Sequence, residues 1–244
     1  MSYVIPDPRW EEPNLLIPGK KPIGPVVVDW SHPITRALSV CLVPMGGICS
    51  NLADASQQSV VTEGTQSGPK IVFNGSQYAV VPVDHIAAGT DRTLMFFSDF
   101  QEAGADAWAG VFTMPNNSGA GNWFGCFQRT SSSSALTVYA DNQTFNVGTF
   151  SDYPAGTVKT AIYTDSTRRV STYADTDTIA DNVAKGTGGR NAISPDPTLH
   201  LNASRGGGAR GVQDFYAAFV WARALRDAER FSMTRNPYQF LIPA

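Results

Sequence analysis

The sequence predicts an all-β protein, an antiparallel two-sheet sandwich that follows an extended, proline-rich arm. From about residue 26 onward, short runs rich in Val, Ile, Phe, Tyr and Thr alternate with clusters of Gly, Asn, Asp and Ser. No segment before residue 222 has the periodicity of a helix. The first 33 residues hold seven of the 16 prolines. A chain of 244 residues is long enough to bury a core of its own.

The first 33 residues are expected to form an anchoring arm, and residues 34–244 the folded domain. Proline fixes φ, removes a backbone donor and keeps the preceding residue extended. The arm also carries apolar side chains that a solvated linker would not need, and these are Trp10, Leu15, Leu16, Ile17 and Ile23. We expect them to contact another surface, either the chain's own domain or a neighbouring subunit.

Twelve runs beyond the arm are predicted to be strands. These are Ser39–Val43, Lys70–Phe73, Tyr78–Val83, Thr93–Ser98, Trp108–Thr113, Trp123–Gln128, Leu136–Ala140, Phe145–Phe150, Val158–Thr164, Val170–Tyr173, Thr198–Asn202 and Phe215–Trp221. One short helix is predicted after Leu225. Asp227 and Glu229 lie in its first turn and Arg235 near its end, where each suits the helix dipole, and Asn236-Pro237 ends it.

Five short motifs occur in order between residues 29 and 240. They are Asp29-Trp30-Ser31-His32-Pro33-Ile34-Thr35-Arg36-Ala37-Leu38, Asn51-Leu52-Ala53-Asp54, Ile71-Val72-Phe73-Asn74-Gly75-Ser76-Gln77-Tyr78, Trp221-Ala222-Arg223-Ala224-Leu225-Arg226-Asp227-Ala228-Glu229 and Asn236-Pro237-Tyr238-Gln239-Phe240. In this order they resemble the motifs of phage-encoded LamG-like (concanavalin A-like) jelly-roll proteins. The resemblance implies a jelly-roll sandwich associated with a virion. It implies little about activity, because this sandwich hosts many activities.

The chain also departs from that family pattern. The residue that caps the terminal helix is usually Ser or Thr, and here it is Arg226, so an N-cap of about 1 kcal/mol is expected to be missing. Residues 156–161 lack the Trp and His of the family's mid-domain strand, and residues 173–176 lack the Gly of its hairpin. We therefore transfer no ligand-binding residue from the family.

The last predicted strand, Phe215–Trp221, is apolar on both faces. Ala217, Phe219 and Trp221 alternate on one face, and the other carries Tyr216, Ala218 and Val220. A strand that is apolar on both sides is covered on both sides. We therefore predict that Phe219 and Trp221 are partner-binding residues, packed under the arm or under another subunit. The alternative is that the strand lines a curved inner sheet beneath long loops.

The acidic residues do not predict an enzyme. Glycoside hydrolysis needs two carboxylates that flank the sugar bond. The five glutamates are scattered over the arm, two predicted loops and the helix, and they are Glu11, Glu12, Glu63, Glu102 and Glu229. Asp175, Asp177 and Asp181 fall in a stretch read as a solvated polar hairpin, and the glycine-rich residues 205–211 are read as a hairpin tip. No catalytic residue is assigned.

No cofactor or metal is predicted either. The three cysteines and three histidines show no metal-ligand spacing, and they are Cys41, Cys49, Cys126, His32, His85 and His200. The cysteines are expected to be small buried apolar residues. A net charge of −3 and a pI near 5.6 argue against a nucleic-acid partner. Neither a signal peptide nor an apolar run of membrane-spanning length is visible.

These observations predict a non-enzymatic bacteriophage structural protein, assembled in the host cytoplasm and located on the virion. The leading interpretation is a capsid decoration protein, or a tail-attached one, whose arm binds the major capsid protein or a tail protein. The second is a tail adhesin that binds a cell-surface glycan, with Trp108 and Trp123 as candidate contacts. The third is a polysaccharide hydrolase. Homo-oligomerisation is left open.

Overall fold

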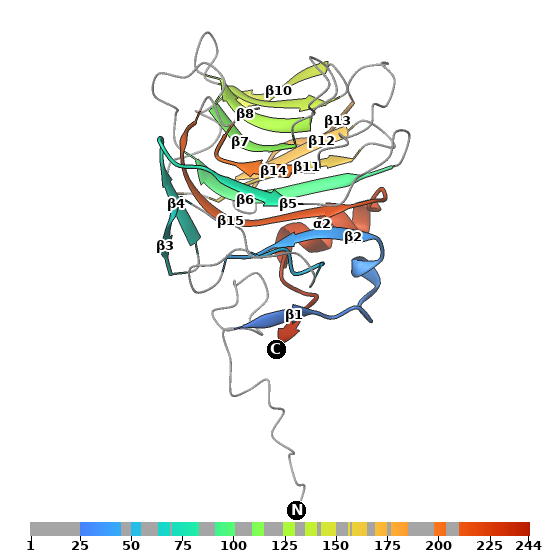
Figure 1. Ribbon diagram of the computed structural model, residues 1–244. Coiled ribbons are helices and arrows are strands. Elements are labelled where there is room, and N and C mark those ends of the chain that lie inside the picture. Colours follow the sequence, from blue (N-terminus) through green and yellow to red (C-terminus); the bar gives the residue numbers. More distant parts are fainter. Residues whose placement is uncertain are drawn as a thin grey trace, which may run out of the picture.

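The computed structural model describes two large antiparallel sheets, a two-stranded ribbon and an α-helix (Figure 1). The residues described are 25–44, 50–54, 63–68, 70–82, 91–100, 109–114, 124–129, 135–140, 143–149, 156, 158–164, 169–174, 177–184, 198–203 and 210–244. This arrangement confirms the predicted all-β sandwich with one short helix near the C-terminus.

One sheet has six strands in the order β10-β9-β8-β7-β14-β5. Its strands are β5 (Ala79–Pro82), β7 (Ala109–Met114), β8 (Phe124–Arg129), β9 (Ala135–Ala140), β10 (Gln143–Thr149) and β14 (Thr198–Leu201). β7 to β10 follow one another as hairpins, whereas β14 inserts between β7 and β5. That long-range insertion joins the two ends of the domain, as sandwich folds require.

The other sheet has eight strands, with the order β13-β12-β11-β6-β15-β4-β3 and with β2 also paired to β15. Its strands are β2 (Leu38–Leu42), β3 (Thr65–Ser67), β4 (Lys70–Asn74), β6 (Thr93–Phe100), β11 (Lys159–Thr164), β12 (Arg169–Ala174), β13 (Asp177–Ala184) and β15 (Val212–Trp221). β15 is the longest of these and pairs with β6 on one side. On its other side it pairs first with β4 and then with β2.

A third layer covers the outer face of the eight-stranded sheet. It consists of the helix α2 (Asp227–Arg235), the short 3-10 helix η2 (Pro33–Thr35), and a ribbon of β1 (Val26–Val28) with β16 (Leu241–Pro243). Figure 1 shows α2 close to β2 and β15, and the ribbon at the end of the molecule near the C-terminus. Residues from this layer share one buried cluster with β2, β6 and β15.

β15 is buried on both faces in its C-terminal half. Ala217, Phe219 and Trp221 belong to the cluster under the third layer, and Ala218 and Val220 are buried without belonging to it. The pairing of β15 with β6 shifts by one residue between Phe215 and Ala217. Because such a bulge leaves one residue out of the alternation, Tyr216 also packs against the cluster. Its predicted place on the opposite face was wrong.

All twelve predicted strands overlap observed ones, and four observed strands lie outside them: β1, β3, β13 and β16. Residues 175–181 were predicted to be a solvated polar hairpin. β12 and β13 are antiparallel neighbours with Ala174 opposite Asp177, which agrees with a hairpin, but the expectation of a loop was wrong from Asp177 onward, since Asp177–Ala184 is β13. β13 is an edge strand that pairs with β12 through two register shifts. Edge strands tolerate polar residues and bulges, because one side of the strand needs no partner.

Some expectations concern single side chains. Cys41 is buried in the core, as predicted, whereas the side chains of Cys49 and Cys126 lie outside the described part. The described residues contain no group of three or more His, Cys, Asp or Glu side chains placed to hold a metal ion. Within the same part of the chain, no helix has both the length and the apolar character needed to cross a membrane.

Candidate functional site

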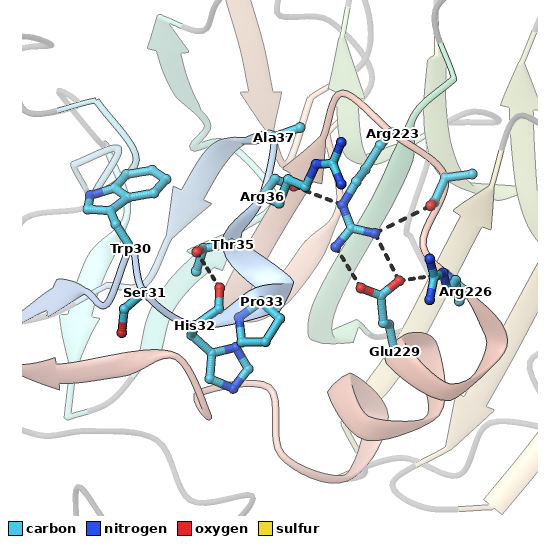
Figure 2. Close-up of a pocket in the computed structure, with 11 residues that line it drawn as sticks. Trp30, Ser31, His32, Pro33, Thr35, Arg36, Ala37, Arg223, Arg226 and Glu229 are labelled. Atoms are coloured by element: carbon cyan, nitrogen blue, oxygen red, sulfur yellow. Dashed lines mark hydrogen bonds and ion pairs between the residues drawn. The ribbon is translucent and has the colours of Figure 1, made fainter.

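A groove of about 780 Å³ opens on the surface between two segments that are far apart in the sequence. Residues 30–37, which follow β1, form one wall, and residues 223–229, which join β15 to α2, form the other. Figure 2 shows Trp30 at one end of the groove and Arg226 at the other. The groove is lined by Trp30, Ser31, His32, Pro33, Thr35, Arg36, Ala37, Arg223, Ala224, Arg226 and Glu229.

The first wall is a tight turn built from local hydrogen bonds. The Asp29 carboxylate accepts from the backbone N–H of Ser31 at 2.9 Å and from its hydroxyl at 2.6 Å. These bonds lower the pKa of Asp29. The His32 carbonyl then accepts from the Thr35 hydroxyl at 2.7 Å, and its imidazole Nδ1 accepts from the N–H of Ile34 at 3.3 Å. Asp and His here act as turn and cap residues, which explains why the short motif folds without a long helix.

Arg223 joins the second wall to the first. Its Nε donates to the Arg36 carbonyl at 2.8 Å and one terminal nitrogen donates to the Ile34 carbonyl at 3.3 Å. The two terminal nitrogens also donate to the two carboxylate oxygens of Glu229, each at 2.8 Å. This bidentate geometry is the strong arrangement for a guanidinium with a carboxylate. The Arg223 side chain therefore bonds to both walls of the groove and fixes them relative to each other.

Glu229 has a second task at the start of α2. Its Oε2 accepts from the backbone N–H of Arg226 at 2.8 Å, and the Arg226 side chain makes no cap hydrogen bond. As predicted, the N-cap residue gives no side-chain hydrogen bond to the helix. The Glu229 carboxylate instead accepts from the backbone N–H of Arg226. The Arg223 guanidinium and the Arg226 N–H hold the pKa of Glu229 below its ordinary value, against the opposing effect of burial.

The exposed groups of the groove are an indole and two guanidinium side chains. Trp30 is 57% exposed although it is one of the largest apolar residues, and Arg36 and Arg226 are also exposed. The lining carries three arginines and one carboxylate, so the groove is net positive at neutral pH. An exposed aromatic ring beside exposed positive charge is typical of a recognition surface.

The two body residues predicted to bind a partner are buried. Phe219 and Trp221 are each 0% exposed. The Phe219 ring meets that of Phe240 edge-on at 5.5 Å between centroids, and the Trp221 indole donates to the Ile34 carbonyl at 2.8 Å. The cover over them therefore comes from the chain's own C-terminal segment and from residues 26–34. In this arrangement neither side chain reaches the molecular surface.

The arm residues predicted to bind a partner, Trp10, Leu15, Leu16, Ile17 and Ile23, lie outside the described residues, as do Trp108 and Trp123. The described end of the arm, residues 25–33, pairs with the chain's own β16 through β1. The arm boundary at residue 33 and a foreign contact of the arm stay predictions.

Sequence reasoning missed the groove residues Trp30, Arg36 and Arg226. Trp30 was present in the first motif, and a tryptophan between Asp29 and Ser31 in a polar turn is a signal for an exposed ring. No local pattern links that turn to residues near 226, which lie about 190 positions later. Only the pairing of β2 with β15 brings the two segments together.

No protein-family model matches this sequence, and no curated protein matches it. Several solved structures share its fold. Trypanosoma rangeli sialidase matches with a TM-score of 0.58 and 13% identity, over 84% of this chain and 33% of the sialidase. The binding domain of botulinum neurotoxin serotype D/C matches with a TM-score of 0.56 and 14% identity, over 85% of this chain and 53% of that one.

The binding domain of Paraclostridial Mosquitocidal Protein 1 matches similarly, with a TM-score of 0.56 and 11% identity over 82% of this chain and 52% of that one. This chain thus spans about a third of the sialidase and about half of each toxin chain. These likenesses agree with the jelly-roll class of sandwich predicted from the sequence, and at such identities they establish the fold alone.

Proposed function

We propose that this chain is a non-catalytic binding module that holds an acidic saccharide in the groove beside Trp30. The observation that carries the proposal is the presence, in one groove, of a 57% exposed indole ring and the exposed side chains of Arg36 and Arg226. These groups differ in what they recognise, and a sugar that bears a carboxylate offers a surface for each.

The indole supplies an apolar, flat face. Tryptophan combines a large contact area with little conformational freedom to lose, and its ring packs against the C–H face of a sugar ring. The turn that carries Trp30 is fixed by the hydrogen bonds of Asp29, so the ring is presented from a rigid backbone. A preformed aromatic platform lowers the entropy lost on binding.

The arginines supply the preference for an acid. A guanidinium donates two parallel hydrogen bonds to a carboxylate, and Arg is favoured wherever planar anions are recognised. Arg223 is already bound to Glu229, whereas Arg36 and Arg226 have exposed side chains at the same groove. The site therefore favours an anionic sugar over a neutral one.

The state of Glu229 supports a binding role over hydrolysis. It is the one carboxylate in the described lining of this groove, whereas most glycoside hydrolases use a pair, and the described lining also lacks a tyrosine that could replace the second carboxylate as nucleophile. Its lowered pKa keeps it ionised, and both its oxygens are bound by Arg223. A carboxylate in that state has no proton to give to a leaving group.

The structural neighbours agree with this choice without establishing it. They include toxin domains described as binding domains, and a sialidase in complex with sialic acid, an acidic sugar. The motif resemblance adds a setting, a bacteriophage particle, which rests on the sequence alone. Of the two virion roles considered, a surface groove for saccharide favours the cell-binding adhesin over capsid decoration, because decoration of a shell needs no saccharide site.

The experiment is a glycan array probed with the intact chain, followed by titration calorimetry on the saccharides that bind. We expect acidic saccharides to bind, with affinity that falls as salt is raised. Trp30→Ala and the double variant Arg36→Ala/Arg226→Ala should each weaken binding by about tenfold or more. Phe231→Ala is the matched control, because Phe231 is 55% exposed on α2 and does not line the groove.

Two outcomes would contradict the proposal. One is saccharide binding that survives both groove variants with unchanged affinity. The other is release of cleaved sugar during incubation, abolished by substitution of a carboxylate. The melting temperature of each variant should match that of the parent, since these three side chains are exposed.

A further inference from the structure

The outer edge of β1 has no paired strand among the residues that the structure describes. β1 pairs with β16 on one side, with Val26 opposite Pro243, Val27 opposite Ile242 and Val28 opposite Leu241. In the described part of the chain, the ribbon contains these two strands alone, so nothing described there pairs with the other side of β1. A free strand edge is a template for one more strand.

Hydrogen bonds in the ribbon identify which backbone groups face that edge. The Asp29 N–H donates to the Phe240 carbonyl at 2.9 Å, and the Ala244 N–H donates to the Pro25 carbonyl at 3.1 Å. In an antiparallel ladder such bonds recur at every second residue. Val27 and Asp29 therefore point their N–H and C=O groups toward β16, and Pro25, which has no N–H, points its C=O there. Val26 and Val28 point both of their groups away from β16.

The opposite edge of the ribbon is closed. On β16 the residues that face outward are Leu241 and Pro243. Pro243 has no N–H, and the Leu241 N–H already donates to the Tyr238 carbonyl at 3.0 Å. An added strand would find both donors and acceptors on β1 alone.

We propose that the chain's own residues Leu15–Ile17 add to the outer edge of β1 as an antiparallel third strand. They precede β1 with eight residues between them, 18–25, whose prolines and glycines suit a loop that reverses direction. This proposal is independent of saccharide binding, since none of these residues lines the groove.

The register follows from the positions of the donors. Val26 and Val28 need partners with an N–H, and Pro18 has none. Placing Ile17 opposite Val26 and Leu15 opposite Val28 satisfies both positions. Side chains alternate along a strand, so Leu15 and Ile17 then face the side where Val26 and Val28 are buried at 4% and 6% exposure.

The same register gives the middle residue a matching environment. Leu16 lies beside Val27, on the face where Val27 is 44% and Ile242 is 42% exposed. Three apolar side chains in a row across three strands shield one another from water. The strand also strengthens a ribbon that is only marginally stable with two strands.

The first test measures amide hydrogen exchange of the full chain, monitored by NMR. Val26 and Val28 should be protected, as Val27 is by its bond toward β16. Leu15→Pro and Ile17→Pro each remove an N–H that the register uses, so Val26 and Val28 should exchange about tenfold faster or more. Leu16→Pro is the matched control, because the Leu16 N–H faces away from β1, and it should leave the protection in place.

The second test is a disulfide between neighbouring strands. In the proposed register Leu16 and Val27 form a non-hydrogen-bonded pair, with Cα atoms about 4.5 Å apart. The variant Leu16→Cys/Val27→Cys should form an intramolecular disulfide under mild oxidation, located by peptide mapping. Leu16→Cys/Ile242→Cys should not, since residues two strands apart are about 10 Å from each other.

Three results would overturn the proposal. Fast exchange of the Val26 and Val28 amides in the parent chain would show that no strand of this chain pairs with the outer edge of β1. That edge would then be available to a strand of another protein. Loss of protection by Leu16→Pro as severe as that by Ile17→Pro would reject the register. A disulfide found between molecules, with a dimer by light scattering, would assign the strand to a second copy.

Discussion

Thr93 illustrates how a single buried hydroxyl positions one wall of the groove. Its side chain is fully buried at the start of β6, opposite Trp221 on β15. The hydroxyl donates to the Arg223 carbonyl at 3.0 Å and accepts from the Leu225 N–H at 2.9 Å. Both of these backbone groups lie where the chain leaves the sheet, so Thr93 satisfies polar groups that the ladder no longer pairs.

Thr93→Val should destabilise the protein by about 1–3 kcal/mol, because it keeps the shape and leaves the Leu225 N–H without a partner. Urea unfolding followed by fluorescence measures the change. Thr164→Val is the matched control, since Thr164 is also a buried strand threonine and its hydroxyl has no partner in the described structure. Equal losses in the two variants would show that the hydroxyl bonds of Thr93 contribute nothing.

At the scale of the element, α2 depends on one glutamate at its start. The helix runs from Asp227 to Arg235, and its first backbone N–H groups have no Ser or Thr cap. Glu229 accepts from the Arg226 N–H and from Arg223, whose side chain is 21% exposed against 24% for Glu229. A charge-assisted cap that is mostly sheltered from water is stronger than an exposed ion pair.

Glu229→Gln should cost about 1–2 kcal/mol at neutral pH, and this cost should shrink in acid. The folded state lowers the pKa of Glu229, so its contribution is complete above the ordinary glutamate pKa of about 4.3 and is lost as the pH falls through the lower folded value. Melting temperatures of the parent and variant, compared between pH 7 and pH 3, should converge at the acid end.

Asp227→Asn provides the comparison for this pH series. Asp227 lies in the same first turn and pairs with Arg230, yet its side chain is 86% exposed. Such an exposed pair contributes little, so Asp227→Asn should change stability by a few tenths of a kcal/mol at neutral pH. A Glu229→Gln difference that stays constant with pH would contradict the ionised cap.

At the scale of the whole molecule, the C-terminal segment covers the buried cluster on the outer face of the eight-stranded sheet. Phe240, Tyr238 and Leu241 pack in one cluster with Phe219 and Met95 of the eight-stranded sheet. Without this third layer the outer face of β15 would expose a large apolar patch, which soluble monomers rarely carry. Both ends of the described chain, β1 and β16, close this layer together.

Phe240→Ala should therefore destabilise the molecule by about 3–5 kcal/mol, the usual cost of removing a fully buried phenyl ring. Ile242→Ala, two residues on, should cost about 1 kcal/mol or less, because Ile242 is 42% exposed. Both are measured by urea unfolding. Similar midpoints for the two variants would mean that the C-terminal segment does not pack on β15.

Much of the architecture was predictable from the sequence for local reasons. The apolar runs that became β6, β11 and β15 encode their own burial, because alternation and β-branched content are properties of a short segment. The helix after Leu225 could be predicted from equally local signals, since its acidic first turn and the Asn236-Pro237 pair that ends it lie within a dozen residues. β13 was missed because a polar edge strand has no such local signature.

The candidate site was beyond the reach of the same reasoning. Periodicity along β15 required that both faces be covered, and by itself it determined that Phe219 and Trp221 would be buried. Only the tertiary structure decided that the cover is the chain's own C-terminal segment together with residues 26–34, and that Trp30 shares a groove with Arg226. Burial follows from the order of apolar residues within one short segment. The identity of the covering segment depends on strand pairing between residues nearly 200 positions apart, and that pairing forms only when the whole chain folds.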